Sequence, residues 1–199
     1  MDGTARLETF SDGVFAIAAT LLVLEIGIQG HDVGGELLDI WPSYLAYVTS
    51  FLVIGIIWLN HHHCVGLIAR VDRSFLFLNL LLLLVVSFIP FPTRLVAEHL
   101  RRSGERPAVL AYAITLLLMA LLYRIWWQYA RGGRRLIRDD VTDAQLKAVD
   151  RAFDPGPPAY ALVLALAFLS PLASVLGTLA LAVFYVPSAA LFERGGEPL

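Results

Sequence analysis

One short run of this 199-residue chain combines residue types that could bind a metal or move a proton, Asn60-His61-His62-His63-Cys64. On a helix, consecutive side chains point about 100° apart, so adjacent histidines do not readily share one ion, whereas His61 and Cys64 at i and i+3 can. The run contains no carboxylate. We therefore expect no metal and no cofactor here. We favour polar contacts between helices, with Ser11 or Asp12 as partners.

The acidic residues Asp12 and Glu25 lie inside the apolar stretch near the N-terminus. Ionisable side chains are costly inside a membrane segment and are usually partnered or functional. The spacing of Asp12 from Arg6 does not suit an i,i+4 pair, so its partner is expected on another segment. We interpret Asp12 as a clamp between helices rather than as an ion ligand.

Sequence patterns that mark common catalytic sites are absent: the chain has no G-x-S-x-G, H-E-x-x-H or P-loop run. Arg94 and Glu98, at i and i+4, are typical of a structural ion pair or an outer vestibule. We therefore expect the protein not to be an enzyme.

Composition indicates the setting in which these residues act. Hydrophobic residues make up 58% of the chain and charged residues 16%, against about 45–50% and about 25% in ordinary soluble domains. Such a chain has too little polar surface for water and needs the lipid bilayer as its partner. Its arginines are scattered rather than clustered, so no nucleic-acid partner is expected.

The apolar stretches predict an all-α integral membrane protein with a single domain, 1–199, of six transmembrane helices. A crossing takes about 20 residues. The last apolar block is too long for one crossing, and Ser170-Pro171 divides it near the middle; one kinked helix is the alternative. The predicted spans are 5–28, 42–66, 74–97, 108–130, 157–171 and 173–192.

Charged residues in the loops predict the orientation. The loop 131–156 is rich in arginine, while the 29–41 loop has acidic residues and no Lys or Arg. By the positive-inside rule, both termini are expected on the cytoplasmic side of the cell inner (plasma) membrane. Within the long loop, Thr142 and Gln145 form a capping box for a short amphipathic helix. We expect this helix on the membrane surface or beneath the bundle.

The first span carries a stripe of residues that share one helical face: Phe10, Gly13, Ile17, Thr20, Leu21 and Leu24. An apolar stripe usually indicates helix packing. In a symmetric oligomer, however, copies of this face could surround an axis and form hydrophobic constrictions beside a layer of hydroxyl groups.

The same segment resembles a known family. The run Arg6-x-x-x-Phe10-Ser11-Asp12 matches the R-x-x-x-F-S-D signature of the transmembrane protein 175 family of potassium channels. The match continues through the following A-I-A-A-T-L run. Similar features follow in the second and third spans, in Trp58-Leu-Asn-His61-His62, Leu78-Asn79 and Pro90-Phe91-Pro92-Thr93.

This resemblance implies a bacterial, single-repeat channel of six helices that assembles as a homotetramer around its first helices. It implies that Ile17 is the main constriction, that Leu21 and Leu24 form further apolar rings, and that Thr20 contributes to cation selectivity. Arg6, Phe10, Ser11, Asp12, Trp58, His61 and His62 would serve as signature and packing residues. The expected function is passive conduction of monovalent cations, with potassium as the permeant ion. The alternative is a secondary transporter, with or without proton coupling, which would show broken helices and repeated halves.

Overall fold

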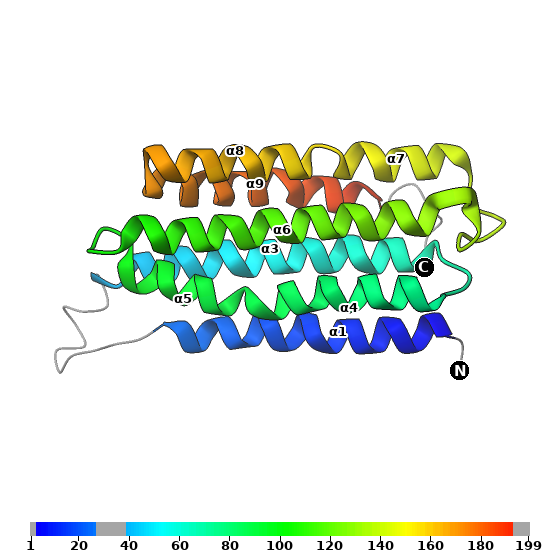
Figure 1. The fold of residues 1–199 in the computed structure, drawn as a ribbon, viewed down its shortest axis with the longest axis horizontal. Helices are drawn as coiled ribbons and strands as arrows, with labels where there is room; N and C mark the ends of the chain where they lie inside the picture. Colours follow the sequence, from blue (N-terminus) through cyan, green and yellow to red (C-terminus); the bar gives the residue numbers. More distant parts are fainter. Residues whose placement is uncertain (1–2, 27–38, 193–199) are drawn as a thin grey trace.

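The computed structural model describes residues 3–26 and 39–192, and they form a long bundle of helices (Figure 1). Within that part of the chain, strand pairing is limited to one antiparallel bridge between Ile68 and Ile137. The prediction of an all-α fold is confirmed. The end of the first predicted span, 27–28, and most of the acidic loop, 29–38, lie outside the described residues. The helices are α1 (Gly3–Leu21), η1 (Leu22–Glu25), α3 (Trp41–Gly66), α4 (Arg73–Phe88), α5 (Pro90–His99), α6 (Glu105–Arg131), η2 (Gly132–Arg134), α7 (Asp143–Phe153), α8 (Gly156–Leu169) and α9 (Pro171–Phe192).

The outside of the bundle is apolar along most of its length. In the described part of the chain, five helical segments are long and apolar enough to cross a membrane, and α9 adds a shorter apolar segment. Large apolar side chains such as Leu84, Leu162 and Phe184 point outward. Apolar side chains are favourable in contact with lipid tails and unfavourable in contact with water. An outer surface of this kind is therefore that of a multi-pass membrane protein.

The helix α1 lies along one edge of the bundle, beside α3 and α4 (Figure 1). Its buried residues recur every three or four positions, which places them on one stripe of a helix with 3.6 residues per turn. They are Leu7, Ser11, Phe15 and Ala18, and Leu22 of η1 continues the stripe. The helix therefore packs by one side only.

Pro90 divides the region that the sequence predicted as one span, 74–97. Proline has no N–H to donate and its ring crowds the carbonyl one turn earlier, so regular α-helical bonding stops before it. The structure accordingly shows α4 ending at Phe88 and α5 beginning at Pro90. The two helices still continue along the same direction of the bundle (Figure 1).

The centre of the bundle is formed by α6, which carries large buried aromatic side chains. Trp126 stacks on the ring of His61 at 4.9 Å and on Phe75 at 5.1 Å, measured between ring centroids. Further along, the hydroxyl of Ser50 hydrogen-bonds those of Thr93 at 2.8 Å and Tyr112 at 2.9 Å. These contacts connect α3, α4, α5 and α6, and the hydrogen bonds of Ser50 satisfy hydroxyl groups that would be costly to bury alone.

The C-terminal helices α8 and α9 run antiparallel, side by side (Figure 1). Ser170 has extended backbone angles and Pro171 starts the next helix, so the chain reverses here instead of continuing as one kinked helix. The hydroxyl of Ser174 donates to the carbonyl oxygen of Val163 at 2.8 Å and joins the two helices.

The helix α7 begins with the predicted capping box of Thr142 and Gln145, which is confirmed. It lies nearly in line with α8 (Figure 1), whereas the sequence predicted it on the membrane surface or beneath the bundle. The physical reason is Asp150, whose carboxylate accepts from the indole N–H of Trp127 at 3.0 Å and pairs with the guanidinium of Arg131. Both partners belong to α6, so α7 is held alongside the end of that helix.

Candidate functional site

The two faces of α1 have opposite surroundings. On the other side of the helix, Ile17 is 61% exposed and Leu21 40%, and Leu24 of η1, which continues this side, is 74% exposed. These three residues and Phe10, which is 56% exposed, belong to the stripe that the sequence singled out. A branched apolar face this exposed contributes nothing to the core of one chain. It is available to lipid or to other copies of the chain.

Thr20 is the hydroxyl-bearing residue of this exposed face beside Ile17. Its Oγ1 donates to the carbonyl oxygen of Ile17 at 2.9 Å. Because the proton is directed into the helix, the lone pairs of Oγ1 are left to accept from water or to approach a cation. The face thus places one oxygen ligand between apolar side chains.

The buried face of α1 is fastened by a chain of hydrogen bonds. The amide Nδ2 of Asn79 in α4 donates to Oγ of Ser11 at 3.0 Å, and Oδ1 of Asn79 is 2.8 Å from Nε2 of His61 in α3. An amide oxygen can only accept, so His61 donates through Nε2–H. Three helices are joined through three fully or almost fully buried polar side chains. In so apolar a setting, each of these groups needs its partner.

Aromatic rings enclose this hydrogen-bonded chain. The ring of His61 lies 5.4 Å from that of Phe15, as well as on Trp126 of α6. Packing on both sides fixes the imidazole, and the imidazole in turn fixes Asn79. The position of α1 therefore depends on a rigid part of the core.

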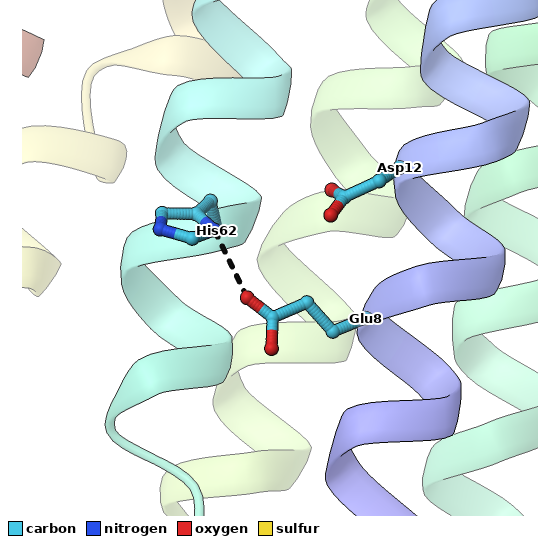
Figure 2. A group of neighbouring side chains, drawn as sticks. All are labelled: Glu8, Asp12 and His62. Atoms are coloured by element: carbon cyan, nitrogen blue, oxygen red, sulfur yellow. Dashed lines mark ion pairs between the residues drawn. The ribbon is translucent and has the colours of Figure 1, made fainter.

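Two further contacts join α1 to α3 at the bundle end where the chain begins. The indole N–H of Trp58 donates to Oδ1 of Asp12 at 2.9 Å. One turn earlier on α1, a carboxylate oxygen of Glu8 lies 3.0 Å from Nδ1 of His62 (Figure 2). Asp12 thus has a partner on another helix, as its spacing from Arg6 predicted.

The sequence of this chain has counterparts among known proteins. A family model described as endosomal/lysosomal potassium channel TMEM175 matches residues 6–90. A potassium channel of Chamaesiphon minutus is 41% identical over 188 residues, which cover 92% of this chain and 93% of that one. One of Streptomyces collinus is 43% identical over 192 residues, covering 93% and 92%. The chain belongs to the TMEM175 family.

A solved structure agrees with this assignment. The crystal structure of a lysosomal potassium-selective channel TMEM175 homolog from Chamaesiphon minutus matches with a TM-score of 0.84 and 40% identity, over 94% of this chain and 97% of that one. The resemblance predicted from the Arg6 to Asp12 run is confirmed. TMEM175 is a family of ion channels and not a class of enzymes.

The segment matched to the TMEM175 family contains all of the α1 contacts just described. The sequence predicted a polar contact from the histidine run to Ser11 or Asp12. In the structure, His61 of that run reaches Ser11 through Asn79. The direct partner of Asp12 is Trp58, which precedes the run.

Other predicted residues lie apart from the hydrogen-bonded chain. Arg6 and Phe10 are exposed on α1. The pair His61 and Cys64, considered as metal ligands, is not brought together: Sγ of Cys64 accepts from the hydroxyl of Tyr123 at 3.4 Å, whereas His61 bonds Asn79.

Sequence reasoning assigned no role to Asn79 or to Glu8. Asn79 could have been found, because a lone amide inside the apolar run Phe75 to Val86 must have a partner when it is buried in a membrane protein. The indication for Glu8 was weaker. Its i,i+4 spacing from Asp12 places the two carboxylates on the same side of the helix.

Charged side chains meet at the opposite end of α1. Arg94 donates to Glu98 at 2.8 Å, as its i,i+4 spacing predicted, and Arg94 also lies 3.8 Å from Glu25. These residues line an open cavity of about 370 Å³ together with Asp39 and Arg102. The cavity adjoins Leu24, the last apolar residue of the exposed stripe.

Proposed function

We propose that this protein is a potassium-permeable cation channel that conducts passively, and that the exposed face of α1 lines its pore. The observation that carries the proposal is the contrast between the two faces of α1. The buried face is hydrogen-bonded to α4 through Ser11, and Asn79 of α4 in turn bonds α3. The side chains of Ile17, Leu21 and Leu24 are instead exposed on the surface of the bundle. The names of the two bacterial relatives, both potassium channels, support the same function.

One helix cannot enclose a pore, so the proposal requires several copies of the chain. We infer a homotetramer in which four copies of α1 surround one axis, as the family resemblance implies. The outward faces of the other helices contact the lipid bilayer. Conduction needs no cofactor, and potassium is the permeant species.

In this arrangement, a ring of Ile17 side chains closes the pore by excluding water, and small outward movements of α1 would rehydrate it. Leu21 and Leu24 add apolar rings. The Thr20 oxygens provide a polar layer between the Ile17 ring and these leucine rings. Potassium sheds its hydration shell at lower cost than sodium, so a narrow pore with few oxygen ligands favours potassium modestly.

We infer that both termini are cytoplasmic and that the protein resides in the inner (plasma) membrane. The positive-inside rule supports this orientation, because four arginines gather where α6 ends and α7 begins: Arg131, Arg134, Arg135 and Arg138. The opposite end carries Arg101, Arg102 and Arg106. There, however, Arg102 shares its cavity with the acidic residues Glu25, Asp39 and Glu98.

The Ile17→Asn variant tests the proposed constriction. A polar ring wets more easily than an apolar one, so this variant should leak ions more than the wild type in planar bilayers, with assembly unchanged. Leu162→Asn on α8 is a matched control, because Leu162 is 62% exposed against 61% for Ile17. Unchanged conductance in Ile17→Asn would show that this residue is not the constriction. Slow electrogenic turnover without unitary events would indicate a transporter instead.

A further inference from the structure

Three side chains with metal-binding atoms converge between α1 and α3. Glu8 and Asp12 lie one turn apart on α1 and point toward α3, from which His62 points back (Figure 2). One ligand atom from each lies within 4.8 Å of the other two. The separation of His62 Nδ1 and Glu8 Oε1 is 3.0 Å.

This set of atoms suits a divalent transition metal. Zinc takes imidazole nitrogen and carboxylate oxygen at about 2.0–2.2 Å, which places tetrahedral ligand atoms about 3.4 Å apart. The separation of His62 and Glu8, 3.0 Å, is within about 0.5 Å of that spacing. The side chains of Glu8 and His62 are 35% and 59% exposed, so small rotations can bring the atoms together. Two carboxylates also balance the charge of a divalent ion.

A neighbouring side chain orients the ligands. The indole N–H of Trp58 donates to Oδ1 of Asp12 at 2.9 Å. The ring of Trp58 also lies 6.2 Å from that of His62. Metal-binding carboxylates are commonly held by hydrogen bonds of this kind, which fix their direction before the ion arrives. The Trp58 contacts are independent of the convergence of the three ligands.

We propose that Glu8, Asp12 and His62 form a binding site for a divalent transition-metal ion of the zinc type, with water completing the coordination. Glu8 and Asp12 are one helical turn apart with like charge, which is unfavourable without a cation between them. The ion joins α1 directly to α3. The site is distinct from the exposed face of α1 and does not depend on the channel function.

The position of the site gives an ion free access. His62 lies four residues before the end of α3, which corresponds to about 6 Å along the helix axis. Glu8 likewise lies in the second turn of α1. A dissolved ion can therefore reach the site from the membrane boundary without crossing the apolar core.

Calorimetric titration of the purified full-length protein in detergent with zinc chloride tests the proposal. We expect one saturable site per chain, and an affinity at least tenfold lower in His62→Gln and in Glu8→Gln. Trp58→Phe should weaken binding about tenfold, because it removes the orienting hydrogen bond. His63→Gln is the matched control, since the next residue on α3 points about 100° away, and it should bind as the wild type does.

Cobalt gives a second measurement that does not depend on variants folding. Cobalt bound in place of zinc should produce visible absorption that zinc abolishes by competition. Absence of saturable binding to the wild type, or wild-type affinity in His62→Gln, would overturn the proposal. Since no current is measured, either result leaves the channel proposal untouched.

Discussion

At the scale of single residues, the position of α1 depends on one amide. Asn79 uses both ends of its side chain, donating to Ser11 and accepting from His61. Neither partner is exposed, so lipid and water offer no substitute. This residue therefore couples α1 to the aromatic core around Trp126.

Replacing Asn79 with leucine tests that coupling. Asn79→Leu keeps a similar volume but leaves Oγ of Ser11 and Nε2 of His61 unpaired. We expect the free energy of unfolding to fall by on the order of 1–2 kcal/mol, measured by denaturant unfolding in detergent.

Ser87→Ala on the same helix is the control for Asn79→Leu. The hydroxyl of Ser87 is exposed and bonds the carbonyl oxygen of Leu84 in its own helix. This control should unfold like the wild type. Equal stability of Asn79→Leu and the wild type would show that the buried chain of hydrogen bonds does not hold α1.

At the scale of helices, the start of α4 is tied to the end of α6 by Asp72. Its carboxylate caps α4 by accepting from the backbone N–H of Phe75 at 2.8 Å, and it also accepts from the hydroxyl of Tyr129 at 2.9 Å. The cap bond, then the Tyr129 bond and the nearby Arg135 charge, lower the pKa of Asp72 below its ordinary 3.8.

The lowered pKa of Asp72 predicts a pH dependence of stability. A carboxyl group whose pKa is lower in the folded state stabilises the fold above its unfolded pKa, and this contribution is lost as pH falls through the folded pKa. Asp72→Asn can still cap the helix but cannot titrate. Between about pH 6 and pH 2, the melting temperature of the variant should therefore fall less than that of the wild type. Parallel melting curves for the two proteins would contradict this.

At the scale of the whole molecule, apolar surface serves two purposes. Most of it, on helices such as α8 and α9, has the apolar character that suits contact with lipid. The exposed face of α1 differs because it contains Thr20 and because Leu24, at its end, lines a charged cavity. We expect a face of this kind where several copies of the chain surround water and ions rather than contact lipid.

Some of this architecture could be predicted from the sequence. The exposed stripe of α1 follows from a local period of 3.6 residues, and the capping box at Thr142 follows from a four-residue pattern. The bond between Asn79 and Ser11 joins residues 68 positions apart, and no local pattern encodes which helices meet. The sequence likewise did not predict that α7 lies in line with α8. This placement depends on the contact between Asp150 and Trp127 of α6, which are distant in the sequence.

The most direct test of the account is cysteine modification on α1. Cys64 is the one natural cysteine and is fully buried, so the wild-type current should be insensitive to a cationic thiol reagent. The reagent should reduce the current of Leu24→Cys and Ile17→Cys by placing bulk and charge in the ion path. Ala18→Cys, at a position 1% exposed, should not respond. If mass spectrometry shows Leu24→Cys and Ile17→Cys modified while their currents are unchanged, this face of α1 does not line the pore.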